Sequence, residues 1–242
     1  MANVPGILTV KNLAVNFDEL NVLYGINFEL SRGENLAVIG PNGSGKTILL
    51  RALLKIIPYE GEIRWAPGIR LGYVPQKIEA DRHLPINLKN LLSAKAHVLG
   101  LQKSETKAVL EETRITEKIL TTPIGHLSGG QFQLALIAFA LLGKPGALLL
   151  DEPTASIDQS GEEQIFELIH KLQDKYGIAA IIVSHDLHFV NHYATKVLCL
   201  NKTGLCFGPP QDALTPEVLH KLYGEQHKYY HHAHHENKSE RD

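Results

Sequence analysis

Several features are scarce in this 242-residue sequence, and each scarcity excludes a class of protein. Two cysteines, Cys199 and Cys206, are too few for a disulfide scaffold and are compatible with a reducing cytosol. Lys and Arg number 24 against 26 Asp and Glu, so the chain lacks the basic excess of a general nucleic-acid binder, and we expect no nucleic-acid partner. The longest apolar run, residues 134–142, is far shorter than the roughly 20 residues that cross a bilayer. Residues 1–10 lack the basic flank and apolar stretch of a signal peptide, so none is expected.

Strand-like and helix-like segments alternate along the rest of the chain. Two short strand patterns come first, and three continuous apolar runs, typical of strands buried on both faces, follow. Helical stretches are predicted at 46–57 and, with one apolar face, around 164–172. Strand, helix and strand at this spacing indicate βαβ units, hence an α/β fold with a mostly parallel sheet. The five strand candidates are 8–17, 22–30, 36–39, 147–150 and 178–183.

Two segments depart from this alternation. Residues 87–120 are rich in Leu, Lys, Glu and Ala at helical spacing, which predicts an α-helical insert into the α/β core. The last residues, 225–242, lose the apolar pattern and become rich in His, so we expect a flexible tail there. There is no long linker and no internal repeat.

A glycine-rich motif follows the first buried strand candidate and fits the pattern G-x-x-x-x-G-K-[ST]. Its glycines let the backbone curl so that successive N–H groups point at an anion, and the next helix aims the positive end of its dipole at the same place. The lysine adds a full charge to the β- and γ-phosphates of a nucleotide, and the threonine hydroxyl suits Mg²⁺. The pattern therefore predicts a nucleotide-phosphate site rather than a merely tight turn. The motif consists of Gly40, Pro41, Asn42, Gly43, Ser44, Gly45, Lys46 and Thr47.

Two carboxylates, Asp151 and Glu152, follow the second buried strand candidate. Ligands of open α/β sheets bind at the carboxyl ends of the strands, which is where these acids lie. We expect Asp151 to hold Mg²⁺ and Glu152 to act as general base toward the water that attacks the γ-phosphate. The alternative, in which both acids only cap the next element, is weakened by the phosphate motif.

A second glycine-rich turn decides between classes of nucleotide enzyme. It lies about 80 residues after the phosphate motif and consists of Leu127, Ser128, Gly129, Gly130 and Gln131. The turn resembles the signature of ATP-binding-cassette (ABC) ATPases. Taken alone it offers a hydroxyl and free N–H groups at a helix start, which is a second anion site.

The resemblance extends from about Leu8 to about Gly224 and implies the fold of that family. This is a P-loop NTPase core with a mostly parallel sheet, an N-terminal antiparallel β part and an α-helical insert. It assigns residues 1–224 to one ABC ATPase domain, with the insert at about 77–142. In the family, the insert grips a membrane permease, here through about residues 75–124.

The resemblance also implies a homodimer and roles for four further residues. Two cassettes would pair head to tail, with each ATP between one P-loop and the partner's signature. Gln76 resembles the loop glutamine that touches Mg²⁺ and its water, and His185 resembles the switch histidine at the γ-phosphate. Asp158 resembles the loop that crosses the dimer interface. Phe17 lies where the family stacks an aromatic ring on adenine, although it could equally be a core residue.

The sequence departs from the family at two places that do not touch the expected phosphate ligands. Phe139 and Gln133 stand where a basic residue is common.

A GTPase is excluded on other grounds, because 201–204 (Asn-Lys-Thr-Gly) lacks the Asp of the guanine-reading motif.

The C-terminal region gives the only indication of cargo. Residues 197–201, 205–210 and 222–224 resemble the zinc/manganese importer branch. The resemblance implies an ATPase, converting ATP and water to ADP and phosphate, that drives metal import through a separate permease. It would lie on the cytoplasmic face of the inner membrane, served indirectly by an extracytoplasmic metal-binding protein. Manganese, iron or metal-chelate import and a soluble, non-transport ABC ATPase are the alternatives.

Histidines of the tail favour zinc, because neutral imidazole is a good zinc ligand whereas manganese prefers oxygen. If that segment were helical, His227, His231 and His235 would share one face. A solvated tail of biased composition is the alternative. The candidate zinc ligands are His227, His231, His232, His234 and His235.

Overall fold

The computed structural model describes residues 6–17, 20–76, 85–155 and 157–224. Its first sheet is antiparallel, with strand order β2-β1-β4. Buried Leu8, Val10, Leu13 and Val15 of β1 form much of its inner face. The strands are β1 (Gly6–Phe17), β2 (Leu20–Ser31) and β4 (Glu60–Trp65).

The second sheet has six strands in the order β5-β6-β7-β3-β8-β9, and all neighbours are parallel except β8 and β9. Every residue of β3, β6 and β7 is buried, as the continuous apolar runs predict. The expected α/β fold with a mostly parallel sheet and an antiparallel β part is confirmed. The strands are β3 (Asn35–Ile39), β5 (Leu71–Val74), β6 (Ala147–Asp151), β7 (Ala179–Val183), β8 (Lys196–Asn201) and β9 (Thr203–Gly208).

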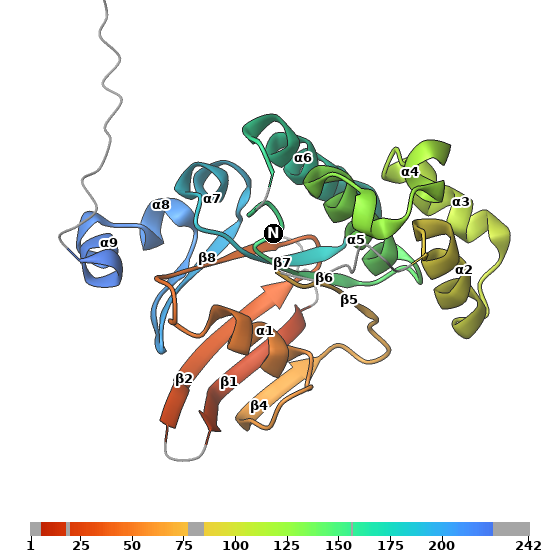
Figure 1. The fold of residues 1–242 in the computed structure, drawn as a ribbon. Helices are drawn as coiled ribbons and strands as arrows, with labels where there is room; N and C mark the ends of the chain where they lie inside the picture. The colour runs from red at the N-terminus through yellow and green to blue at the C-terminus, as the bar shows by residue number, and fades with distance from the viewer. Residues whose placement is uncertain (1–5, 18–19, 77–84, 156, 225–242) are drawn as a thin grey trace, which may run out of the picture.

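Two hydrophobic clusters cover the two faces of the six-stranded sheet. Figure 1 shows how the helices are arranged around this sheet. On one face, helix α1 (Lys46–Leu53) packs between this sheet and the antiparallel sheet. The helix predicted at 46–57 ends four residues early, at Leu53. Two residues later, Lys55 adopts a positive φ of 58°, which is not helical. The helices associated with the other face are α5 (Gly129–Leu141), α6 (Gln159–Tyr176), α7 (Leu187–Tyr193), α8 (Pro210–Ala213) and α9 (Pro216–Tyr223).

The insert is helical, as predicted for residues 87–120. Asn87 caps its first helix through a reciprocal pair of hydrogen bonds with Asn90. A third hydrophobic cluster, including Leu88, Leu92 and Ala138, joins the insert to α5. Its helices are α2 (Leu88–Val98), α3 (Lys103–Glu112) and α4 (Glu117–Thr121), followed by a 3₁₀ turn, Ile124–His126.

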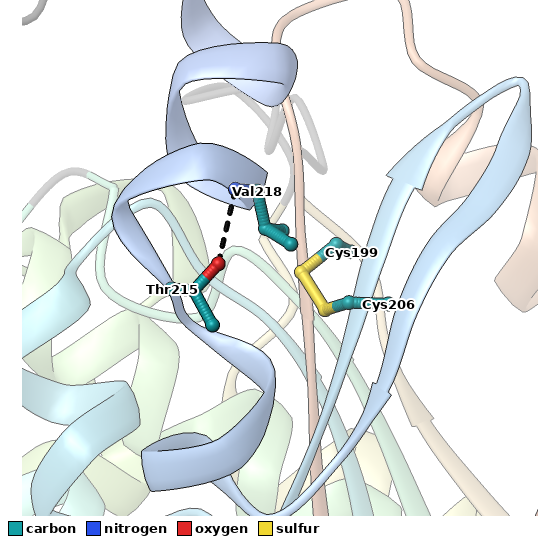
Figure 2. Close-up of a disulfide and its surroundings, with 4 residues drawn as sticks. All are labelled: Cys199, Cys206, Thr215 and Val218. Carbon is teal, nitrogen blue, oxygen red and sulfur yellow. Dashed lines mark hydrogen bonds between the residues drawn. A yellow bond between two sulfur atoms is a disulfide. The ribbon is translucent and has the colours of Figure 1, made fainter.

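The two cysteines form a disulfide that was not predicted from the sequence. Cys199 of β8 and Cys206 of β9 lie opposite each other in the antiparallel ladder, with their Cα atoms 4.8 Å apart. Figure 2 shows the bond beside Val218, whose backbone N–H donates to the Thr215 hydroxyl at the start of α9. Within the described ranges, no helix combines the length and apolar character needed to span a membrane.

Candidate active site

The predicted phosphate motif forms the connection between β3 and α1. Gly43 and Gly45 have φ values of 78° and 101°, in the region that favours glycine. A Cβ atom at Gly45 would lie 2.5 Å from Cδ2 of Leu23, and one at Gly40 would overlap the carbonyl oxygen of Leu200. No side chain of the described residues caps the first turn of α1. Its N–H groups therefore remain available to an anion.

Lys46, the first residue of α1, is only 6% exposed. Its ammonium group donates to the carbonyl oxygens of Gly40 and Pro41, at 2.9 and 3.1 Å. Burial lowers the pKa of Lys46, whereas the negative charges of Glu152 and Asp151 act in the opposite direction. The cation is thus held inside the turn by weak neutral acceptors, which a phosphate could replace.

Asp151 ends β6 and is 1% exposed. Neither carboxylate oxygen makes a hydrogen bond to a described residue, and the buried Ser44 hydroxyl is also unpartnered. Burial raises the pKa of Asp151, an effect opposed by the nearby Thr47 hydroxyl and reinforced by Glu152. A buried carboxylate without donors is costly, and a bound cation would remove that cost.

Glu152, the next residue, lies between two predicted site residues. Its Oε2 accepts from the Gln76 amide at 2.5 Å, and its Oε1 lies 2.6 Å from Nε2 of His185. Glu152 has a φ of 49°, uncommon for a residue with a side chain, and its N–H donates to Val183. Three segments that are far apart in the sequence therefore converge on one carboxylate at the carboxyl end of the sheet.

The second glycine-rich turn begins α5, and its cap differs from the expectation. The Ser128 hydroxyl accepts from the N–H of Gln131, and the Gln131 side chain accepts from the N–H of Ser128. The prediction of free groups was therefore wrong for the N–H of Ser128, because a capping box satisfies it. A Cβ at Gly130 would lie 3.7 Å from Ile157, so this turn approaches the segment that precedes α6.

Asp158 and Phe17 are two further predicted site residues that the structure describes. Asp158 is the N-cap of α6, where its Oδ1 accepts from the N–H of Gly161 at 3.1 Å. Phe17, the last residue of β1, is 41% exposed, so the alternative of a core residue is wrong. Its stacking on adenine stays a prediction.

Three residues around the phosphate turn and Asp151 were not predicted from the sequence. Burial and the charge of Asp151 raise the pKa of Tyr73, and the Arg51 guanidinium acts against this shift. The N–H of Lys202, in the β8–β9 turn, donates to the carbonyl of Ser44 at 3.0 Å. Arg51 could have been found from the sequence, because it follows Thr47 by one helical turn. The contact of Lys202 could not, because it depends on tertiary structure.

The histidines proposed as zinc ligands lie outside the described residues. Among residues 6–17, 20–76, 85–155 and 157–224, no group of three or more His, Cys, Asp or Glu side chains is arranged to hold a metal ion. The expected Mg²⁺ ligands are of another kind: the carboxylate of Asp151, the hydroxyl of Thr47 and the side-chain amide of Gln76.

Comparison with known proteins agrees with this geometry. The sequence profile of the ABC transporter family matches residues 23–155, which is more than half of the chain. The chain belongs to the ABC transporter family. As an ABC ATPase, it binds ATP and hydrolyses it to ADP and phosphate.

Two curated relatives of this ABC ATPase carry the same description. The zinc import ATP-binding protein ZnuC of Haemophilus influenzae is 37% identical over 93% of this chain and 82% of the relative. The protein of the same name from Photorhabdus laumondii is 38% identical over 94% and 89%. The two alignments cover nearly the whole ABC ATPase.

Solved structures agree on the fold. CbiO1 from Clostridium perfringens, part of the ABC transporter complex cbiONQ, is 28% identical with a TM-score of 0.77, covering 89% of this chain and 93% of the other. The ATP-binding subunit of another ABC transporter is 25% identical with a TM-score of 0.74, covering 85% and 91%.

Proposed function

We propose that this ABC ATPase powers the import of zinc through a separate membrane permease. The support for zinc is the similarity, over more than nine tenths of the chain, to proteins described as zinc import ATP-binding proteins. The support for the mechanism is one observation of this chain, the Glu152 carboxylate held between Gln76 and His185.

We infer that the phosphates of ATP bind in the β3–α1 turn. The uncapped N–H groups of α1 and the ammonium of Lys46 are suited to the β- and γ-phosphates. Residues Gly40 to Gly45 would supply the curled backbone, and exposed Phe17 would stack on adenine. Lys46 would exchange its two carbonyl partners for phosphate oxygens.

Asp151, Thr47 and Gln76 fit a Mg²⁺ ion. Both carboxylate oxygens of Asp151 are buried without a donor, and hard oxygen ligands are what Mg²⁺ prefers. When bound, Mg²⁺ neutralises charge on the β- and γ-phosphates.

Glu152 is the proposed general base. Its carboxylate accepts a proton from water while the water oxygen attacks the γ-phosphorus. The bond from that phosphorus to the bridging oxygen breaks, which leaves ADP and phosphate. His185 and Gln76 hold the carboxylate from both sides, and His185 is also suited to contact the γ-phosphate.

We infer a head-to-tail homodimer in which Ser128, Gly129, Gly130 and Gln131 of a second copy complete the site. The signature turn of a single chain satisfies its own cap and holds no lysine like Lys46, so it suits a phosphate already bound by another subunit. Asp158 would lie at the same interface. The helical insert would contact the permease at the cytoplasmic face of the membrane, and an extracytoplasmic metal-binding protein would deliver the cargo.

The histidine-rich segment 225–242 is the proposed zinc-binding tail, since imidazole is a preferred zinc ligand. Titration of Zn²⁺ into the full chain and into a chain lacking residues 225–242 tests this role. Equal zinc uptake by the two forms would exclude it.

The Glu152→Gln variant tests the active site and the dimer together. We expect ATP and Mg²⁺ to convert this variant from monomer to dimer in size-exclusion chromatography, with turnover reduced at least 100-fold. Glu163→Gln, at an exposed position of α6, is the matched control and should hydrolyse ATP normally. A Glu152→Gln variant that stays monomeric and hydrolyses ATP at the normal rate would refute the assignment.

The cargo needs a separate experiment. Proteoliposomes containing this ATPase and the permease recovered with it should import radioactive zinc when supplied with ATP. Faster uptake of manganese, of iron or of a metal chelate would replace zinc as the cargo. Recovery of ribosomes or nucleic acid in place of a hydrophobic permease would favour a soluble ABC ATPase.

A further inference from the structure

A cavity of about 370 Å³ lies at the end of the six-stranded sheet opposite to the ATP site. Arg70, Gly146 and Ile178, which line it, each directly precede a strand, whereas Asp151 and the phosphate turn lie where strands end. Helix α3 of the insert forms another wall. The cavity therefore lies at the junction between the helical insert and the α/β core, and its volume is in the range of small-molecule pockets.

The inner wall of this cavity is apolar and comes from separate elements. Ile69 precedes β5, Val109 belongs to α3, Leu141 ends α5 and Leu172 lies on α6. These side chains would contact the body of an apolar ligand, whose transfer from water is favourable in proportion to its buried area.

The acidic residues of the lining already have partners. Glu105 forms an ion pair with Lys144 at 3.2 Å. Glu112 accepts from the Tyr176 hydroxyl at 2.7 Å and pairs with Lys175. Neither carboxylate is left to attract a cationic ligand.

Arginines of the lining, in contrast, form no close ion pair with a described residue, although the charge of Arg70 contributes to the lowered pKa of Glu105. Within the described part of the chain, the guanidinium groups of Arg32 and Arg70 make no ion pair and no side-chain hydrogen bond, although both residues line the cavity. A guanidinium presents a planar fork of donors that matches a carboxylate or phosphate. The cavity thus combines an apolar interior with two available anion-binding groups.

We propose that this cavity binds a small amphipathic anion, with an apolar body against Ile69, Val109 and Leu172 and an oxyanion head at Arg32 and Arg70. Such a ligand contacts the helical insert and the core at once. The site is separate from the ATP site, so the proposal does not depend on the proposed cargo.

Decanoate and decyl phosphate are suitable probes, because they share one apolar chain and differ in the anionic head. Isothermal titration with the full chain, saturated with ADP and Mg²⁺, should show one saturable site for at least one of them. Decyltrimethylammonium, which has the same chain and a cationic head, should bind at least 10-fold more weakly. Equal affinity for the cation and the anions would overturn the proposal, and so would the absence of saturable binding of either anion.

Variants locate the site. The double change Arg32→Gln and Arg70→Gln should weaken anion binding at least 10-fold, whereas Arg64→Gln, an exposed arginine outside the lining, should not. Ala108→Trp should block the cavity from α3, and Ala94→Trp, exposed on α2, is its control. Binding of ADP by each variant checks that it is folded. Anion affinity unchanged in both the double arginine variant and Ala108→Trp would also overturn the proposal.

Discussion

Two helices of this protein begin at glycine-rich turns, and they begin differently. Helix α1 has Gly45 as its N-cap and no side-chain cap, and the ammonium of Lys46 lies buried in the turn. Helix α5 has Ser128 as its N-cap, and Ser128 and Gln131 satisfy each other's N–H groups. The α1 turn therefore needs an anion to complete its hydrogen bonds, whereas the α5 turn is stable without one. This difference supports a primary phosphate site at α1 and an accessory site at α5.

Lys46→Ala tests the primary site and should have the largest effect. Removal of the buried ammonium leaves the turn without its full positive charge, so we expect ATP affinity to fall at least 100-fold. Equilibrium titration with a fluorescent ATP analogue measures this, with Lys11→Ala on β1 as the exposed control. ATP affinity that stays normal in Lys46→Ala would exclude the α1 turn as the main phosphate site.

Asp151→Asn tests the cation part of the same site. We expect hydrolysis to require at least 10-fold more Mg²⁺, with turnover also reduced at least 10-fold, because an amide is a weaker ligand than a carboxylate. Burial raises the pKa of Asp151 above its ordinary value of 3.8, so the folded chain holds this proton more tightly than the unfolded chain. As the pH rises through the window between the two pKa values, this group therefore makes the nucleotide-free protein less stable.

Urea unfolding of the nucleotide-free protein at a series of pH values checks that sign. The free energy of unfolding should decrease more steeply with rising pH in the unchanged protein than in Asp151→Asn across that window. In the same window, Mg²⁺ affinity of the unchanged protein should fall as the pH falls, because protons compete for the carboxylate. An identical pH dependence of stability in the two proteins would contradict the raised pKa.

Much of the primary site could be predicted from sequence because its residues are contiguous or follow a strand directly. Residues 40–47 form one turn, and Asp151 and Glu152 end one buried strand. The contacts of Glu152 with Gln76 and His185 were not predictable from spacing, since they join three segments through the order β5-β6-β7 of the sheet. The resemblance to the ABC family supplied those residues instead.

The accessory site and the β8–β9 pair were predicted less well, for different physical reasons. The capping box of Ser128 has its sequence signal, a Gln three residues after a Ser, but the expectation of free N–H groups ignored it. Cys199 and Cys206 are brought opposite each other by the ladder register, which a bulge shifts after Cys199. Spacing alone does not determine such a register.

Ser128→Ala sharpens the comparison by changing the accessory site alone. We expect ATP binding by the monomer to be unchanged and turnover, which the proposed dimer would carry out, to fall about 10-fold. Loss of the cap should also destabilise the protein by about 1 kcal/mol.

Thr215→Ala separates these two effects. Thr215 is likewise an N-cap whose hydroxyl accepts a backbone N–H, but it begins α9, away from the glycine-rich turns. This variant should lose similar stability in urea unfolding and keep its turnover. Equal losses of turnover in Ser128→Ala and Thr215→Ala would mean that the cap of α5 acts only through stability.

The disulfide tests how firmly the primary site depends on its neighbours, and here we expect the smallest change in ATP affinity. Strand β8 pairs with β3 at Ile39 and Cys199, directly before the phosphate turn, and Lys202 donates to Ser44. Reduction should destabilise the chain by about 2 kcal/mol, because the disulfide closes a short loop in the unfolded state. ATP affinity should change less than threefold, since the β3–β8 ladder persists without the bond.

Urea unfolding and ATP titration with and without reductant measure both effects, with Cys206→Ser as the variant that reductant should not affect. A tenfold loss of ATP affinity on reduction would show that the α1 turn is held by the β8–β9 pair rather than by its own glycines.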